Sequence, residues 1–220
     1  MANEKTKYCK EAFEKLPAEK RERVLSAARG EFADHGFENT SIQQIARKAQ
    51  ISVGAVYKYF DDKEALFITV VQEGLGTLED MLMTLSESEE DIIIKAEKII
   101  RTLLDFSREK PELIKLYHSL TVSGSKEMLI ELSQRIEAIS ASIYTVAISD
   151  AQRTGDVRSD INPAFFAFLL DNIFMMLQFS TACDYYKERF FIYTGKQAEE
   201  SDELIVQQTL LFLKAAFNFK

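Results

Sequence analysis

The chain has 220 residues, which is enough for one large domain or for two smaller ones. Hydrophobic residues make up 46% of it and charged residues 28%, proportions that exclude an intrinsically disordered chain. The formal net charge of −8 argues against a protein that binds nucleic acid through a broadly basic surface.

The first part of the chain predicts helices, because apolar residues recur three and four positions apart and lack the alternation typical of strands. Residues 1–16 form a short amphipathic extension. A longer helix then begins at Pro17, whose missing N–H is harmless in a first helical turn. It ends at His35 and Gly36, where glycine can adopt a positive φ. We therefore expect an all-α fold.

Two short helices joined by a tight break follow. The first begins at Thr40, whose hydroxyl is expected to cap the helix while Gln43 returns a hydrogen bond. Residues 49–51 form the break, and Ser52 caps a second short helix over residues 53–60. This spacing predicts a helix-turn-helix, in which the first helix crosses the phosphate backbone of DNA and the second enters the major groove.

The remaining residues predict a larger helical domain. Asp62 is a good cap for a helix from Lys63 to about Leu85. Further helices are expected at 91–109, 111–120, 126–154, 163–193 and 202–218. We expect an N-terminal extension over 1–16, a helix-turn-helix domain with the start of the connecting helix over 17–64, and a larger helical domain over 65–220.

The chemistry of the short helices fits DNA, although the local charge gives little help. Residues 1–65 hold 12 Lys and Arg against 11 Asp and Glu, whereas residues 66–220 hold 15 against 24. Binding must therefore depend on the placement of single groups. The amides at a helix start can hold a phosphate, and the small Gly54 and Ala55 allow close approach to base edges.

The run TSIQQIARKAQISVGAVYKYFDDKEALF, residues 40–67, resembles the DNA-binding signature of the TetR family of bacterial transcription regulators. The preceding VLSAARGEFADHGFENT is similar to the first helix of that family and its glycine-containing exit. One departure is Tyr59, which stands where the family frequently has His. The resemblance implies that Thr40 and Ser41 contact phosphate, that Gln43 and Gln44 lie near the groove, that Val53, Gly54 and Ala55 face bases, and that Tyr57, Lys58, Tyr59 and Lys63 hold the DNA backbone.

The family resemblance also implies a homodimeric repressor that binds a palindromic operator. The last two long helices would pair with their copies in a four-helix interface, and their apolar surface exceeds what one small domain can bury. The expected interface residues are Phe165, Phe168, Leu169, Met176, Phe179, Leu211, Phe212 and Ala215.

A small-molecule inducer is expected in the larger domain, in a cavity between the helices at 91–109, 111–120 and 126–154 and the start of the helix at 163. No charged cluster is visible there, so the ligand should be mainly apolar. The candidate contacts are Phe106, Tyr117, His118, Tyr144, Asn172 and Gln178. A DNA-anchored protein that docks another protein and takes no inducer is the alternative.

Other classes of function fit poorly. Cys9 and Cys183 form no metal-binding pattern, and no phosphate loop or nucleophile motif is present, so we expect no enzyme, metal or cofactor. The charged N-terminus predicts no secretory signal, and hence a cytoplasmic protein. The apolar segment 165–183 is nearly long enough to cross a membrane, but Asp171 interrupts it and favours a buried helix.

Overall fold

The computed structural model describes residues 8–86, 90–120 and 126–217. These residues contain no β-strand; they form helices, together with an isolated bridge between Cys9 and Phe60. The structure therefore confirms the predicted all-α fold. Its elements are α1 (Glu11–Glu14), α2 (Ala18–Asn39), α3 (Ile42–Lys48), α4 (Val53–Tyr59), α5 (Lys63–Ser86), α6 (Ile92–Glu109), α7 (Pro111–Leu120), α8 (Lys126–Thr154), α9 (Pro163–Ala182), α10 (Asp184–Thr194), the 3₁₀ turn η1 (Ala198–Glu200) and α11 (Asp202–Phe217).

The chain divides into two compact units. One consists of residues 1–76 with 115–132, and the other of residues 77–114 with 133–220. The long helices α5 and α8 each contribute to both units. The domain limits expected from the sequence, 17–64 and 65–220, remain a prediction.

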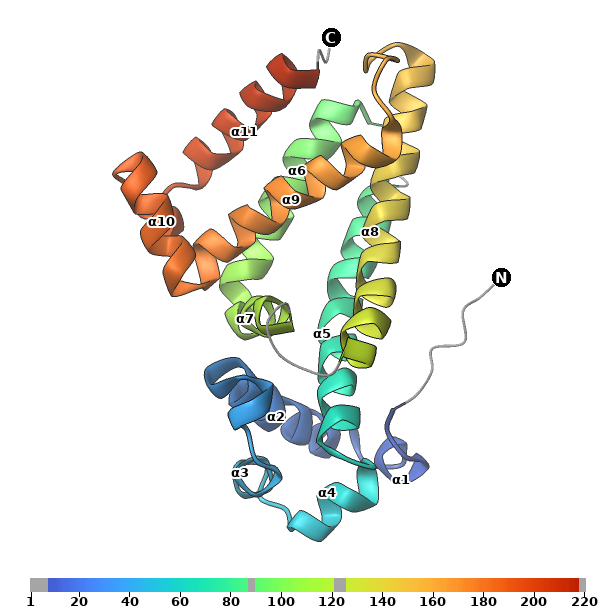
Figure 1. The fold of residues 1–220 in the computed structure, drawn as a ribbon, viewed down its shortest axis with the longest axis vertical. Coiled ribbons are helices and arrows are strands. Elements are labelled where there is room, and N and C mark those ends of the chain that lie inside the picture. Colours follow the sequence, from blue (N-terminus) through green and yellow to red (C-terminus); the bar gives the residue numbers. More distant parts are fainter. Residues whose placement is uncertain (1–7, 87–89, 121–125, 218–220) are drawn as a thin grey trace. The chain divides into compact units, whose positions relative to one another are not determined.

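The first unit is built on α2, with α1, α3 and α4 grouped near it (Figure 1). The α2 residues that face its core are fully buried, and Phe32 packs its ring edgewise on Phe67 of α5 at 4.9 Å between centroids. Phe37 completes the group at 5.1 Å from Phe67. Gly36 has φ 74° and ψ 169°, which confirms the predicted positive φ and kinks α2 before its last residues. This kink turns the chain toward α3.

The second unit packs α6 against α9 and α11, as Figure 1 shows. Its core includes Ile100 and Leu104 of α6, Phe166 of α9 and Leu213 of α11, all at most 1% exposed. The Arg101 guanidinium reaches the Glu203 carboxylate at 2.6 Å. The start of α11 is thus held on α6 by an ion pair as well as by apolar contacts.

One predicted helix is wrong in its extent. The segment expected to be continuous from 163 to 193 is broken at Cys183, whose backbone is extended at φ −109° and ψ 126°. The helix α10 starts afresh at Asp184, and η1 was not expected at all. Sequence periodicity gave no sign of the break, because apolar residues continue through it on both sides. Among the described residues, α9 alone has the length and apolarity of a membrane span, properties that a core helix shares.

Candidate nucleic-acid interface

The start of α3 is closed by a reciprocal pair of hydrogen bonds. The Ser41 hydroxyl accepts from the Gln44 amide at 3.3 Å, and the Gln44 side-chain oxygen accepts from the Ser41 amide at 3.0 Å. The predicted capping box is therefore present but lies one residue later than expected, with Ser41 and Gln44 in place of Thr40 and Gln43. Gln43 is left exposed on the outer face of α3.

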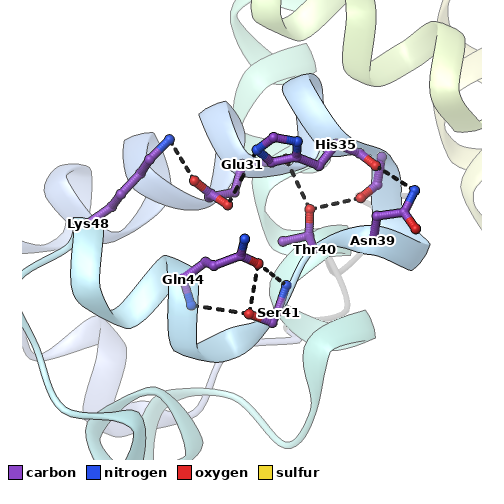
Figure 2. A network of polar contacts seen from close by, with 8 residues as sticks. Glu31, His35, Asn39, Thr40, Ser41, Gln44 and Lys48 are labelled. Atoms are coloured by element: carbon purple, nitrogen blue, oxygen red, sulfur yellow. Dashed lines mark hydrogen bonds and ion pairs between the residues drawn. The ribbon is translucent and has the colours of Figure 1, made fainter.

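Thr40 lies inside the protein. Its side chain is 3% exposed, and its hydroxyl lies 2.9 Å from the Glu31 carbonyl oxygen and 2.8 Å from that of Gly36 (Figure 2). The hydroxyl therefore secures the loop between α2 and α3. A phosphate contact by this side chain, expected from the sequence, does not fit its burial.

The far end of α3 is anchored to α2 by charge. The Glu31 carboxylate, 4% exposed, pairs with the Lys48 ammonium at 2.6 Å, as Figure 2 shows. His35 Nε2 lies 4.0 Å from the other carboxylate oxygen. In addition, Arg23 Nε donates to the Ala49 carbonyl at 3.0 Å. These contacts fix the C-terminal end of α3 on α2.

The turn between α3 and α4 is tight. Gln50 adopts φ 56°, a left-handed conformation that a non-glycine residue takes at a cost, and the Ile51 amide donates to the Ala46 carbonyl at 3.0 Å. The Ser52 hydroxyl then accepts from the Ala55 amide at 3.1 Å and starts α4. This confirms the predicted cap and places two helices of seven residues each across a short turn.

The two faces of α4 differ in exposure. Val56 and Phe60 point inward and are at most 1% exposed. The outer face presents Gly54, Lys58 and a Tyr57 side chain that is 49% exposed. Val53 and Ala55 are half-buried at the margin of this face. Gly54 and Ala55 add little side-chain volume near the start of α4, so a partner can approach the helix backbone there.

Two residues expected at the surface of this region instead stabilise it. Tyr59 is 6% exposed and packs on Phe13, with 5.8 Å between ring centroids. The Lys63 ammonium lies 2.7 Å from the Phe37 carbonyl and 3.2 Å from that of Thr40, and sits 4.4 Å from the centre of the Phe37 ring. Lys63 therefore closes the carbonyl end of α2. Because the carbonyls and the aromatic ring come from a distant helix, local spacing gave no sign of this role.

Comparison with known proteins places these helices in a family. Residues 24–70 match the family model described as bacterial regulatory proteins of the TetR family. The HTH-type transcriptional regulator RutR of Escherichia coli strain K12 is 31% identical over 122 residues, which cover 54% of this chain and 56% of RutR. The DNA-binding region of the chain, residues 24–70, belongs to the TetR family. The match nevertheless spans only about half the length of this curated relative.

Solved structures share the fold of about nine-tenths of the chain. Salmonella enterica GusR superposes with a TM-score of 0.69 at 19% identity and covers 92% of this chain and 97% of its own. AibR, solved in complex with isovaleryl coenzyme A and operator DNA, gives a TM-score of 0.66 at 18% identity, covering 88% and 96%. At these identities the likeness establishes the fold alone.

The predicted dimer surface of the chain is largely exposed. Phe165 and Phe168 of α9 are 60% and 59% exposed, and Leu211 and Phe212 of α11 are 57% and 55% exposed. Leu169 and Ala215 are also exposed, and Met176 is half-buried. Phe179 differs: it is 2% exposed and its ring lies 5.2 Å from that of Tyr186 in α10. The helix break at Cys183 folds α10 back onto Phe179, so this residue belongs to the chain's own packing.

The six predicted ligand contacts are divided between the two units. Phe106, Tyr144, Asn172 and Gln178 belong to the second unit, whereas Tyr117 and His118 lie in the part of α7 that belongs to the first. Phe106, Tyr144 and Gln178 are buried, and the Asn172 amide donates to the Phe168 carbonyl at 2.7 Å. A cavity of about 460 Å³ does open between the start of α6 and α8, but none of the six lines it.

A polar cluster that sequence reasoning missed joins α8 and α9. Burial, followed by repulsion from the Glu137 carboxylate, raises the pKa of the Asp171 carboxyl to about 6, and a hydrogen bond with Ser140 acts in the opposite direction. Burial and the Asp171 carboxylate together raise the pKa of the Tyr144 phenol. The Tyr144 ring meets that of Phe174 edgewise at 5.7 Å. The apolar character of the surrounding sequence hid this cluster.

Proposed function

We propose that the chain is a transcription regulator that binds double-stranded DNA with α4 in the major groove and α3 across the backbone. The observation that supports this most strongly is the outer face of α4, on which small residues directly follow the Ser52 cap. A Cβ atom added at Gly54 would contact the Ser52 hydroxyl oxygen at 3.9 Å and, outside the helix's own backbone, no other described atom within 4 Å. Base edges can therefore reach the helix backbone there.

The contacts divide by exposure. Val53, Gly54 and Ala55 face bases, and Gln43 lies at the groove beside them. Gln44 also lies near the groove. Ser41 and the amides at the start of α3 hold a phosphate, while Tyr57 and Lys58 hold another. The side chains of Thr40, Tyr59 and Lys63 are engaged within the protein, so these residues hold the two short helices in place and do not contact DNA.

We further propose a homodimer that recognises a palindromic operator. The exposed apolar side chains of α9 and α11 support this, because a monomer in water gains stability by covering them. Sedimentation velocity tests it: Phe168→Glu should give a monomer, whereas Val146→Glu, at a position 57% exposed on α8, should not. A wild-type chain that sediments as a monomer would overturn the assignment.

The proposed regulator is a cytoplasmic repressor, without catalytic activity, that a small and mainly apolar ligand releases from DNA. AibR was solved with both operator DNA and an acyl-coenzyme A, and this supports a ligand-controlled mode for a chain of the same fold. Gln178 supports a polar anchor, since its side-chain nitrogen is buried without a hydrogen-bond partner among the described residues. A ligand carbonyl would satisfy it.

Selection from a random duplex pool tests DNA binding directly. Wild-type protein should enrich an inverted repeat whose half-sites are centred about one helical turn, roughly 10 base pairs, apart. Tyr57→Ala and Lys58→Ala should weaken binding to every duplex, whereas Ala55→Val should change the preferred sequence. Lys98→Ala, in the second unit, is the control. Enrichment of no sequence, or binding abolished by excess random DNA, would contradict the proposal.

Ligand control is tested on the selected duplex. Some short- or long-chain fatty acids, or their coenzyme A thioesters, should raise the melting temperature of the protein and release it from the DNA. Gln178→Leu should weaken the response without changing DNA affinity, and Gln134→Leu, at an exposed position of α8, should leave it unchanged. Stabilisation without release would instead indicate a ligand that does not control binding.

A further inference from the structure

Residues 8–14 lie before the TetR match, which begins at residue 24, yet they contact the end of α4 directly. Cys9 pairs with Phe60 in an isolated antiparallel bridge, and the Lys10 amide donates to the Tyr59 carbonyl at 2.8 Å. The Lys10 ammonium donates to the Tyr57 carbonyl at 3.0 Å. Backbone and side chain of the same residue thus engage two carbonyls of the recognition helix.

An apolar contact reinforces this polar one. Phe13, on the single turn α1, is 3% exposed. Its ring lies 4.8 Å from that of Phe60 and 5.8 Å from that of Tyr59. Since a helix of four residues has little stability of its own, packing on α4 is what holds α1 in place. The reverse also holds, because the same contacts bury the far end of α4.

The recognition helix needs such support. It has seven residues, and short helices are marginal in water. Ser52 caps its start, but its end runs into an extended Phe60 at φ −133°, with no glycine to close it. The Tyr57 carbonyl is among the last four, which have no partner within the helix. A lysine ammonium there satisfies the carbonyl and opposes the negative end of the helix dipole.

We propose that residues 8–14 act as a clamp that holds α4 in its DNA-binding conformation, with Lys10 and Phe13 as positioning residues that do not contact DNA. The inference rests on the DNA-binding function proposed above. A clamp lowers the cost of ordering the end of α4 when DNA binds, so its loss weakens affinity for all duplexes. A lysine that bound phosphate would also weaken it, so the two roles need a measurement that separates them.

Salt dependence provides that measurement. Removing one phosphate contact lowers the slope of log affinity against log salt by about 0.9, whereas removing a positioning contact leaves the slope unchanged. Phe13→Ala changes no charge at all. Lys15→Met is a matched control for Lys10→Met, because Lys15 directly follows the clamp and, among the described residues, forms an ion pair only with Glu11, at 2.6 Å, with both side chains more than 70% exposed.

The experiment combines amide exchange of the free full-length chain with affinity for the selected duplex at several salt concentrations. In Lys10→Met and Phe13→Ala, the Phe60 amide, which donates to the Val56 carbonyl at 2.9 Å, should exchange about tenfold faster. The Gln44 amide at the start of α3 should be unchanged. Affinity should fall about tenfold with the salt slope preserved. Lys15→Met should change none of these.

Unchanged exchange at Phe60 in both variants would overturn the clamp, and so would faster exchange with undiminished affinity. A slope reduced by about one in Lys10→Met would make Lys10 a phosphate contact instead. If wild-type protein enriches no duplex, the proposed function fails, and the exchange result still decides whether the clamp exists. Lys10→Met also guards against a Phe13→Ala variant that does not fold.

Discussion

The ion pair between α2 and α3 yields a quantitative prediction, because the chain contains an exposed pair of the same length. Lys48 and Glu31 approach to 2.6 Å, and so do Lys15 and Glu11. The carboxylate of Glu31 is 4% exposed, whereas that of Glu11 is 77% exposed. Burial is therefore the main difference between the two pairs, although Glu31 and Lys48 also join two helices whereas Glu11 and Lys15 lie within one turn. The substitutions are Lys48→Met and Lys15→Met, which keep most of the side-chain volume.

Because Glu31 is buried and Lys48 is half-exposed, removing one partner of this pair should cost a different amount of free energy from removing the other. Lys48→Met leaves a buried carboxylate without its cation, and breaking such a pair costs about 3 kcal/mol. Glu31→Gln leaves the half-exposed Lys48 ammonium free to be hydrated, so it should cost about 1 kcal/mol. Lys15→Met should change the free energy of unfolding by less than about 0.5 kcal/mol. The expected order is therefore Lys48→Met, then Glu31→Gln, then Lys15→Met.

Urea denaturation followed by far-ultraviolet circular dichroism measures these values, since the chain contains no Trp for fluorescence. Lys48→Met should also weaken DNA binding, because the end of α3 is released from α2. Equal costs for Lys48→Met and Lys15→Met would refute the reasoning. A larger cost for Glu31→Gln than for Lys48→Met would do so as well, because it would place the contribution in the carboxylate's hydrogen bonds.

Three further predictions concern single residues. Folding raises the pKa of the Asp171 carboxyl from 3.8 to about 6, so between pH 4 and pH 6 the folded state binds more protons than the unfolded state and loses stability as pH rises. Asp171→Asn should therefore stabilise the chain by about 1–2 kcal/mol above pH 6 and not at all below pH 4. Melting temperatures of both proteins measured across this pH range check this. Gly36→Ala should lower the free energy of unfolding by about 1–3 kcal/mol, because Gly36 has φ 74°. Gly54→Ala lies inside a helix, so it should raise the free energy of unfolding by up to about 1 kcal/mol and yet impair DNA recognition. Equal effects of the two substitutions on the urea midpoint would contradict the backbone argument. Ser52→Ala should cost about 1 kcal/mol and speed exchange of the Ala55 amide, an effect that Ser52→Asp should largely restore.

Local rules in the sequence were sufficient for the elements that depend on neighbours along the chain. Ser52 and Asp62 cap their helices as expected, because a short polar side chain reaches amides two or three residues ahead whatever the rest of the fold does. The positive φ of Gly36 follows in the same way. Together with the spacing of α3 and α4, these features were enough to predict the helix-turn-helix, whereas the family was indicated by the resemblance of residues 40–67 to its signature.

Tertiary structure decided which of these side chains stay exposed and which bind partners inside the protein. Thr40, Tyr59 and Lys63 belong to the DNA-binding motif in sequence, yet packing against α2 and α1 turns them to internal partners. The contact of Lys10 with Tyr57 joins residues 47 positions apart, and no local pattern marks it. Helical periodicity tells which residues share a face, whereas the partner of that face is set by the free energy of packing distant segments together.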